Sequence, residues 1–370
     1  MKDNKAKKQL IFLTAGGTGG HIYPAEAVAA ELLARGYDVE FVTDARGKGN
    51  YKGILGEIKN YAVCSGALVG KSKLFKLKSL IKTGFGVMQA FVLILRKKPA
   101  CVVGFGGYAS FPCSVAAVLL GVKLVLHEQN SVMSRTNRLL GRFADVIVKS
   151  FAEVKYLPVN KKIDFCGMPI RKQIADLHSQ SRNMVDDELR VLVLGGSQGA
   201  KVFADVLPEA FKLVADNGIK KLSVVQQCRQ EDCAALENKY IKTNIKAKVS
   251  HFFGNMPELY RNSDIIISRA GASSVCEILA AGIPSILVPL PIAADNHQYF
   301  NAMNVVDANA GILLEQKDFT AQKVAELLSE VEKNPSLLEF FSQNAKNSAI
   351  IDAAARFADV IEKQISTRKD

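Results

Sequence analysis

"LIFLTAGGTGGHIYPA", residues 10 to 25, joins an apolar run to a glycine-rich turn and then to a helical pattern. Glycines let the main chain approach a ligand closely, and the helix start offers N–H groups and a positive dipole end that suit phosphate. The spacing fits neither the G-x-G-x-x-G fingerprint nor a Walker A loop, because no Lys-Ser or Lys-Thr follows. The stretch predicts a strand, a turn and a helix, and the turn either binds an anion or is simply a tight connection.

A second stretch of the same plan, "RVLVLGGSQGA" (residues 190 to 200), follows about 180 residues later. Apolar runs alternate with helical patterns around both stretches, which indicates an α/β fold with parallel sheets. The expected strands are residues 9–14, 38–43, 100–105, 123–127, 145–149, 190–195, 221–226, 248–252, 264–268 and 285–289. We predict two Rossmann-like domains with parallel sheets that face each other, and we expect the glycine-rich turns to line a shared central cleft, because such folds bind ligands beyond the carboxyl ends of their strands.

The length of 370 residues, 48% of them hydrophobic, fits two globular domains. We expect an N-terminal domain over 1–165, a C-terminal domain over 166–346, and a helix within 347–370 that could pack back on the N-terminal domain. Seven cysteines without a C-x-x-C pair indicate reduced thiols in a cytosolic protein, with no disulfide frame or metal site. The apolar run near the N-terminus is too short for a secretory signal.

One uncharged window, residues 99 to 122, is long enough to resemble a membrane span. Gly106, Gly107 and Pro112 interrupt it, and such residues break a single long helix. We therefore expect a buried strand, helix and strand in this window.

The charge is unevenly distributed. The formal net charge is +12, and residues 58 to 127 contain no Asp or Glu. Ten basic residues lie in this interval: Lys59, Lys71, Lys73, Lys76, Lys78, Lys82, Arg96, Lys97, Lys98 and Lys123. A basic excess confined to one region indicates one anionic partner surface rather than a nucleic acid.

A third turn lies in "SDIIISRAGASSVCE", residues 263 to 277. A strand is followed by small residues and a helix, which Ser273 or Ser274 is expected to cap. Glu277 then lies one turn into the helix, where its carboxylate could accept two hydrogen bonds from a vicinal diol such as a ribose. It could equally be an ordinary acidic residue favoured by the helix dipole. The following "DNHQ" (295 to 298) is rich in donors and acceptors, as a sugar site requires.

Together, "GGTGGH", "GFGGY", "HEQN", "GGSQGA", and "RAGASSVCE" followed by "DNHQYFNA" resemble the MurG family, in order from residue 10 to about 305. The resemblance implies a GT-B hexosyltransferase of peptidoglycan synthesis, and so of cell-wall biogenesis, cell shape and division. It would transfer N-acetylglucosamine, with inversion, from UDP-N-acetylglucosamine to undecaprenyl-diphosphate-linked muramyl-pentapeptide (lipid I to lipid II). The resemblance also implies a peripheral enzyme on the cytoplasmic face of the inner membrane, beside other cell-wall synthesis proteins and without a cofactor.

The resemblance assigns roles by position. Asn130 and Gln298 match contacts to the donor sugar, Arg171 and Ser197 match diphosphate contacts, and the main chain of Phe253 matches a uracil contact. The remaining implied donor contacts are Thr18, Gly19, Gly20, Ala272, Ser273, Ser274, Val275, Cys276 and Glu277. Gly107 and Tyr108 in "GFGGY" are implied acceptor contacts, although Tyr108 could instead support its loop. The chain departs from the family pattern at Met168, where Asn is common, and at His297, where Gln is common.

An inverting transfer requires a general base for the proton of the attacking 4-hydroxyl. His21 closes the first glycine-rich turn, and an imidazole titrates near pH 6.5. Glu128 is a second candidate, and His21 could instead position the acceptor or cap the helix. The leaving UDP gains negative charge, which helix N-termini can stabilise without a metal.

The basic segment from 71 to 98 has two interpretations. Its apolar residues at helical spacing are expected to lie mostly in the core: Leu77, Leu80, Ile81, Phe85, Met88, Phe91, Val92 and Leu95. Five residues at its start are harder to bury and are expected to dock on an anionic membrane: Lys73, Leu74, Phe75, Lys76 and Lys78. The alternative is a solvated lysine-rich loop.

Three other functions compete with this interpretation. A related UDP-sugar glycolipid synthase would use another acceptor, and a membrane-bound nucleotide-sugar sensor would bind the donor without transferring the sugar. A nicotinamide dehydrogenase is disfavoured because the G-x-G-x-x-G fingerprint is missing.

Overall fold

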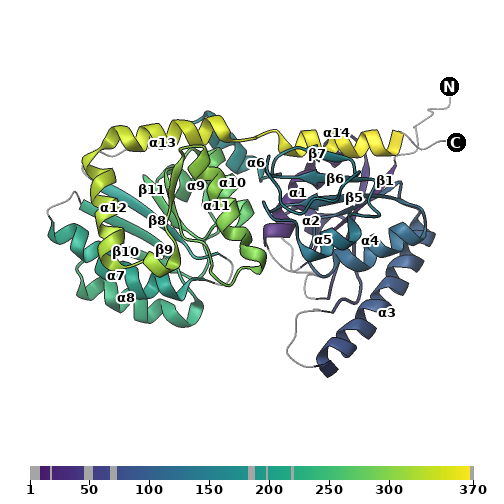
Figure 1. Cartoon of the computed structure of the whole chain (residues 1–370), viewed down its shortest axis with the longest axis horizontal. Coiled ribbons are helices and arrows are strands. Elements are labelled where there is room, and N and C mark those ends of the chain that lie inside the picture. The colour runs from purple at the N-terminus through teal and green to yellow at the C-terminus, as the bar shows by residue number, and fades with distance from the viewer. Residues whose placement is uncertain are drawn as a thin grey trace. The chain divides into compact units, whose positions relative to one another are not determined.

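The computed structural model describes residues 9–16, 19–45, 53–66, 73–181, 188–196, 199–217 and 221–366 (Figure 1). The chain divides into two compact units, residues 1–171 with 352–370 and residues 172–351. The first unit therefore ends at Arg171 rather than at residue 165, and the chain returns to it at Asp352 rather than at 347.

Unit 1 contains a seven-stranded parallel sheet in the order β3-β2-β1-β4-β5-β6-β7. Its strands are β1 (Leu10–Thr14), β2 (Asp38–Thr43), β3 (Asn60–Ala62), β4 (Cys101–Gly104), β5 (Lys123–Glu128), β6 (Val146–Lys149) and β7 (Ile163–Phe165). The five strands expected from the sequence are present. The expectation missed β3 and β7, which are three-residue strands at the two edges.

The described part of unit 1 contains six helices. They are α1 (Gly19–Ala34), α2 (Ile54–Glu57), α3 (Lys73–Lys97), α4 (Ser110–Leu119), α5 (Arg135–Leu140) and α14 (Ala353–Ser366). Apolar side chains fill both faces of the sheet: Ile11 and Leu13 belong to one buried cluster, and Phe12 belongs to the other. The uncharged window forms β4 and α4 and leads into β5, so the prediction of a buried strand, helix and strand is confirmed.

Unit 2 contains a six-stranded parallel sheet in the order β10-β9-β8-β11-β12-β13. Its strands are β8 (Glu188–Leu194), β9 (Lys221–Gln227), β10 (Lys246–Ser250), β11 (Ile265–Ser268), β12 (Ser285–Leu287) and β13 (Gly311–Leu313). Its helices are α6 (Lys172–Ala175), α7 (Lys201–Asp216), α8 (Cys233–Lys242), α9 (Met256–Arg261), α10 (Ala272–Ala281), α11 (His297–Asp307), α12 (Ala321–Lys333) and α13 (Pro335–Ser348), with 3₁₀ turns at Asp176–Ser179, Gln230–Asp232, Ala294–Asn296 and Gln316–Asp318.

The two sheets share one topology. In each, the strand order reverses beside the first strand of the unit, between β1 and β4 and between β8 and β11. Ligands of doubly wound folds bind at this point, outside the carboxyl ends of the strands. The turns after β1 and β8 are the two glycine-rich stretches, so the topology puts each of them at the expected ligand-binding edge.

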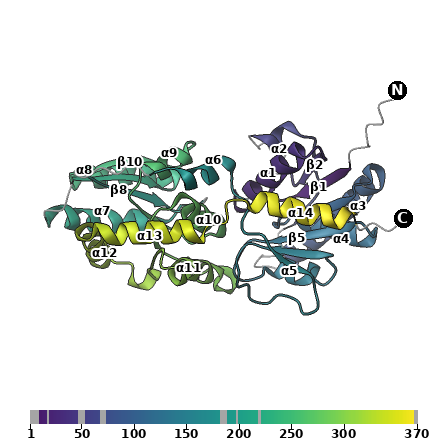
Figure 2. The ribbon, with the colours of Figure 1, turned by 90° about the horizontal axis from the view of Figure 1, so that it is seen from above.

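The predicted C-terminal helix within 347–370 is present as α14, and it packs back on the N-terminal unit as expected. Unit 2 ends with α13, and α14 packs against α1 of unit 1 (Figure 2). Arg35, just after α1, joins the two helices: its guanidinium donates to Asp359 at 2.6 Å, to Glu362 at 2.9 Å and to the carbonyl of Ala355 at 3.0 Å. The end of the chain thus covers the helix that begins at the first glycine-rich turn.

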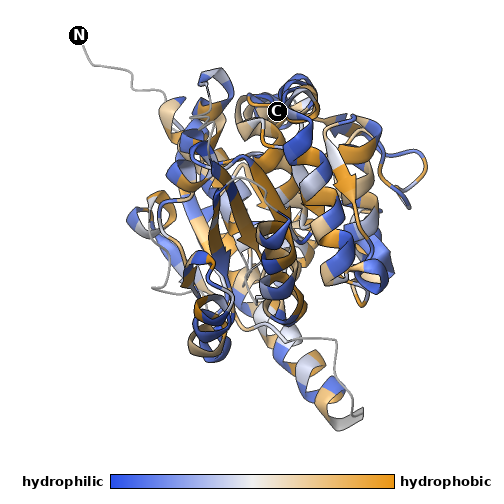
Figure 3. Cartoon of the chain, turned by 90° about the vertical axis from the view of Figure 1, so that its left-hand side faces the viewer, coloured by the Kyte–Doolittle hydropathy of each residue, from blue (hydrophilic) through white to orange (hydrophobic). Residues whose placement is uncertain are grey.

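The long helix α3 buries mostly small residues and exposes most of its large apolar ones, and Ile94, near its end, is the large residue that it buries. The buried positions include Ser79, Thr83, Gly86 and Ala90, and a Cβ at Gly86 would lie 1.8 Å from the carbonyl oxygen of Cys64. This close approach leaves no room for bulky side chains. The exposed residues, 40 to 66% accessible, are Leu77, Leu80, Ile81, Phe85, Met88, Val92 and Leu95. The prediction that this stripe lies mostly in the core is therefore wrong, and Figures 1 and 3 show α3 projecting from the rest of unit 1.

The Arg35 contacts predict how firmly α14 is held. Replacing Arg35 by Ala removes three charge-assisted contacts to α14, and we expect unit 1 to lose about 1–2 kcal/mol of unfolding free energy. Amide hydrogen exchange within α14 should accelerate accordingly. Arg356→Ala is the control, because its contact with Asp352 joins two half-exposed side chains and should contribute about 0.5 kcal/mol or less. Equal exchange rates in the two variants would contradict this role of Arg35.

Candidate functional site

In unit 1, the turns after β1 and β4 touch through their main chains. The N–H of Gly16 donates to the carbonyl of Gly106 at 3.3 Å. Gly107 has φ +76°, and a Cβ there would lie 2.7 Å from the carbonyl oxygen of Gly16. Both the conformation and the lack of space require glycine at this position.

His21 is the third residue of α1 and lies against the second turn. A Cβ at Gly106 would lie 3.0 Å from Cε1 and Nδ1 of its ring. Burial lowers the pKa of His21, and the carbonyl of Phe105 and the side chain of Gln129 oppose that shift. The imidazole is therefore neutral near pH 7 and can accept a proton. Gly19 and Gly20 form the first turn of α1, whereas Thr18 lies outside the described residues.

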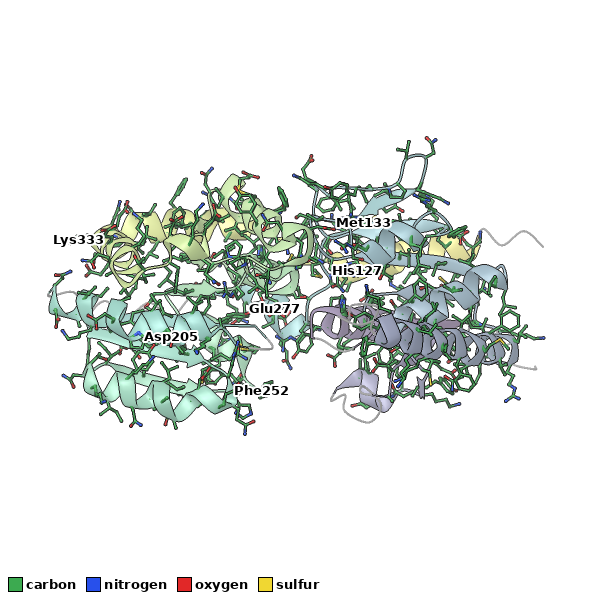
Figure 4. The ribbon with its side chains drawn as sticks, turned by 60° about the horizontal axis from the view of Figure 1, so that its bottom comes forward. His127, Met133, Asp205, Phe252, Glu277 and Lys333 are labelled. Carbon is green, nitrogen blue, oxygen red and sulfur yellow. The ribbon has the colours of Figure 1, made fainter. Side chains whose placement is uncertain are left out.

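A second histidine, His127, lies at the end of β5 (Figure 4). Its ring packs against Phe105 and against Phe357 of α14, with ring centroids 5.5 and 5.3 Å apart. Its Nε2 is hydrogen-bonded to the hydroxyl of Ser150 at 2.8 Å. Burial, and then the nearby His21, lower the pKa of His127 to about 3. It is thus a neutral core residue that lies beneath the turns after β1 and β4.

Glu128 organises the loop that follows β5. Its Oε1 accepts the N–H of Asn130 at 3.0 Å, and its Oε2 accepts the N–H of Ser134 at 2.9 Å and the side-chain amide of Asn137 at 2.8 Å. Burial raises the pKa of Glu128, and these donors oppose the shift. Because both carboxylate oxygens already hold the loop, Glu128 is a poorer candidate for the general base than His21.

Two further predicted contacts belong to unit 1. Tyr108 follows Gly107 and is exposed. Arg171 is the last residue of the unit, and its guanidinium stacks on the ring of Tyr23 at 4.2 Å from the centroid. Since Tyr23 lies two residues after His21, this stacking brings Arg171 to the start of α1.

In unit 2, the turn after β8 is also built by close main-chain contact. A Cβ at Gly195 would lie 2.5 Å from the backbone nitrogen of Ala200, and Gly196 has φ +78°. Ser197 lies outside the described residues. The turn after β11 precedes α10, whose N-cap is Gly271 with no capping side chain. The prediction that Ser273 or Ser274 caps this helix is therefore wrong, because both lie within its first turn.

The α10 segment carries most of the predicted donor contacts. Ala272 and Val275 are buried, and burial raises the pKa of the Cys276 thiol to about 12, so this thiol is protonated at neutral pH. Glu277 lies on α10 (Figure 4) and accepts a hydrogen bond from the hydroxyl of Tyr260 at 3.1 Å. The first turn of any helix presents N–H groups without intrahelical acceptors, which suits the phosphates of a nucleotide.

The segment 288–298 follows β12 and leads into the start of α11. Gln298 accepts the N–H of Leu290 at 2.9 Å, and His297 is bonded through Nδ1 to the carbonyl of Ala294 at 2.8 Å. Asn301, fully buried, donates to the carbonyl of Ala270 at 3.1 Å. Phe253, the predicted uracil contact, is half-buried in the loop between β10 and α9.

Sequence reasoning missed two residues whose side chains hydrogen-bond to the loops of the candidate site. Arg269 is buried and donates to the carbonyls of Val288 and Pro289 and to the side chain of Gln316, and burial lowers its pKa. Gln129 donates to the carbonyl of Phe105 at 2.9 Å. Both lie within quoted motifs, and the available signal was a polar residue directly after a buried strand.

Comparison with protein families defines the class of this protein. The N-terminal domain of glycosyltransferase family 28 matches residues 11–149, and the C-terminal domain of the same family matches residues 190–364. With two parallel-sheet α/β domains that carry glycine-rich turns at their binding edges, the chain is a glycosyltransferase of the GT-B fold.

Individual relatives narrow this class. The chain is 40% identical over 359 residues to the UDP-N-acetylglucosamine--N-acetylmuramyl-(pentapeptide) pyrophosphoryl-undecaprenol N-acetylglucosamine transferase of Paramagnetospirillum magneticum, covering 96% of both chains. It is also 40% identical to the transferase of that name from Rhodospirillum rubrum, covering 95% of this chain and 91% of the relative. The crystal structure of Acinetobacter baumannii MurG aligns with TM-score 0.76 and 30% identity, covering 96% of this chain and 99% of that one. This chain belongs to the MurG family.

The environment of His127 predicts a pH-dependent stability of unit 1. The pKa of His127 is about 3 in the folded protein and about 6.5 in an unfolded chain. Below pH 6.5 the unfolded chain therefore binds more protons, and the free energy of unfolding falls with pH by up to about 1.4 kcal/mol per pH unit from this group. His127→Gln should make this decline shallower in denaturant titrations between about pH 7 and pH 5. His21 contributes with the same sign but is present in both proteins, so identical slopes would contradict the assignment.

Proposed function

We propose that this chain transfers N-acetylglucosamine from UDP-N-acetylglucosamine to the 4-hydroxyl of lipid-linked N-acetylmuramyl-pentapeptide, with inversion, in peptidoglycan synthesis. The observation that carries the proposal is full-length similarity, at 40% identity, to transferases named for this reaction. The enzyme is peripheral and works at the cytoplasmic face of the inner membrane, where the lipid-linked acceptor is available to it.

The donor binds at the carboxyl edge of the unit 2 sheet. Its diphosphate lies at the start of α10, where unpaired N–H groups and the helix dipole stabilise negative charge. Glu277 accepts hydrogen bonds from the ribose, Gln298 contacts the sugar, and the main chain at Phe253 contacts the uracil. Support comes from the loops themselves, since the interactions of Arg269, Gln298 and Asn301 hold the turns around the start of α10 in fixed conformations.

The chemistry is one displacement. The acceptor 4-oxygen bonds to C1 of the sugar while the bond between C1 and the diphosphate oxygen breaks, and the bonding electron pair leaves with UDP. His21 takes the hydroxyl proton, because its lowered pKa keeps the imidazole neutral. Gly107 and Tyr108, on the turn that touches the first glycine-rich loop, contact the acceptor.

Helix α3 provides the membrane contact. Its exposed apolar face runs from Leu77 to Leu95, and Lys76, Lys78 and Lys82 are exposed beside it. Among the described residues, the stretch Phe75–Lys97 of α3 is the one helical segment whose length and composition would allow it to span a membrane. An apolar face with flanking lysines favours a helix that lies in the plane of an anionic bilayer surface. Lys73, Leu74 and Phe75 begin the same helix; the side chains of Lys73 and Leu74 lie outside the described residues.

The catalytic proposal predicts UDP release that requires both substrates. With donor and a lipid-linked acceptor, the parent should release UDP continuously, and His21→Ala should lower kcat by roughly 10² to 10⁴. The affinity for UDP-N-acetylglucosamine should change only a few-fold. Since the base must be neutral and its pKa is lowered, the parent rate should decline only below pH 6.5, and the variant should lose this limb.

Two outcomes would contradict the proposal. Donor binding without acceptor-dependent UDP release would indicate a nucleotide-sugar sensor. Retention of both rate and pH profile in His21→Ala would exclude His21 as the base. Arg356→Ala is a suitable control for kcat, because Arg356 belongs to a surface ion pair on α14.

The membrane proposal predicts vesicle binding that depends on the exposed face of α3. Replacing Ile81 and Phe85 by Ser removes two large apolar side chains, and we expect the partition coefficient on anionic vesicles to fall tenfold or more, because each buried side chain contributes about 1.5 kcal/mol or more. Lys76→Glu with Lys78→Glu should weaken binding further and reduce its salt dependence, at about 1 kcal/mol per lysine.

Leu139→Ser is the matched control for vesicle binding, since Leu139 is a similarly exposed apolar residue on α5. Both α3 variants should still transfer sugar to a short-chain, water-soluble acceptor. Sedimentation of the α3 variants with anionic vesicles at the parent level would show that this face does not bind the membrane.

A further inference from the structure

A buried hydrogen bond joins two helices beside the donor-binding edge of unit 2. Tyr260 lies at the end of α9, and its hydroxyl donates to Oε2 of Glu277 on α10 at 3.1 Å. The two side chains are only 1% and 6% exposed. Neither residue type at its sequence position indicates this pairing, because β11 separates the two helices.

The hydrogen bond between Tyr260 and Glu277 does more than pack the two helices together. A buried carboxylate is costly unless its oxygens are hydrogen-bonded, and a bond from a neutral donor to a charged acceptor is stronger than one between neutral groups. A glutamate side chain has three rotatable bonds, and ordering it upon ligand binding costs free energy. A hydrogen-bond donor that is fixed in the core, as the Tyr260 hydroxyl is, orders the glutamate side chain before the ligand binds. Much of the ordering cost is then removed from ligand binding.

Tyr260 is well anchored for this task. It belongs to the short helix that follows the loop with Phe253, and its carbonyl accepts the N–H of Ser263 at 3.3 Å. Ser263 in turn donates through its hydroxyl to the carbonyl of Leu259 at 2.6 Å. The phenol ring therefore extends from a closed helix end, and its hydroxyl position is set by the backbone of α9.

We propose that Tyr260 is a positioning residue for the ribose of the nucleotide donor. It holds Glu277 in the orientation in which the carboxylate accepts hydrogen bonds from the ribose hydroxyls. Through α9, it also couples this orientation to the neighbouring loop that contacts the uracil. The inference rests on the proposed function, because it takes Glu277 to be the ribose contact.

The test removes one hydroxyl group. Tyr260→Phe keeps the ring and its packing, and we expect the Kd for UDP and the KM for UDP-N-acetylglucosamine to rise about tenfold, while kcat at saturating donor stays within about twofold. Tyr240→Phe is the matched control: Tyr240 is the other fully buried tyrosine described in this unit, and its hydroxyl is bonded to the side chain of Gln226. This control should leave the Kd for UDP within about twofold of the parent value.

Two further measurements separate positioning from simple support of the fold. In the Glu277→Ala background, Tyr260→Phe should cause no additional loss of UDP affinity, because the two residues act in series. The affinity for 2′,3′-dideoxy-UDP should be equal in the parent and in Tyr260→Phe, since this ligand lacks the ribose hydroxyls. Two results would contradict the inference: an equal loss of affinity for UDP and for 2′,3′-dideoxy-UDP in Tyr260→Phe, or a further loss of UDP affinity when Tyr260→Phe is added to Glu277→Ala. In either case Tyr260 supports only the fold.

Failure of the underlying site assignment gives a different result. If the parent binds UDP and 2′,3′-dideoxy-UDP equally well, Glu277 is not a ribose contact. This conclusion does not depend on the UDP affinity of Tyr260→Phe. If UDP binding follows the expected pattern but no UDP is released when acceptor is added, the proposed reaction fails and the positioning role of Tyr260 stands.

Discussion

The architecture of the unit 1 site depends on the contact between the main chains of Gly16 and Gly107. A single Cβ at Gly107 would lie 2.7 Å from the Gly16 carbonyl oxygen, so any larger residue would force the turns after β1 and β4 apart. Because the two strands are neighbours where the strand order reverses, this contact fixes the start of α1 and brings the ring of His21 against Gly106. In unit 2 the close contact lies within a single turn, between Gly195 and Ala200 after β8, so the glycine-rich stretch there also has a steric reason.

Buried polar side chains form a second layer beneath the proposed contacts. His127, Glu128, Arg269 and Tyr260 are all buried, and each is hydrogen-bonded to a neighbouring side chain or main-chain group. Such bonds offset the cost of burying polar groups and leave the loops few alternative conformations. The layer therefore prepares the edges of both sheets for a ligand, and the C-terminal helix takes part in it through Phe357.

Helix α3 shows how packing distance decides which face of a helix is buried. An amphipathic pattern usually indicates that the large apolar residues face the core. Here the close approach of Gly86 to Cys64 admits only small side chains at that point, so most of the large apolar residues of α3 remain outside, and only near the end of the helix is a large one, Ile94, buried. This exposed apolar face and its position in an acid-free, basic region are the basis of the proposed membrane contact.

Local sequence determined the glycine-rich turns, the alternation of strands and helices, and the ordered motifs that identify the family, because each depends on residues close together in the chain. Tertiary structure decided the rest. The short strands β3, β7 and β13 exist through hydrogen bonds to a neighbouring strand, and three residues carry too little periodicity to predict them. The hydrogen bonds to both carboxylate oxygens of Glu128, the lowered pKa of His21 and the bond between Tyr260 and Glu277 likewise depend on contacts that only folding creates. Burial and hydrogen bonding follow from neighbours in space rather than in sequence.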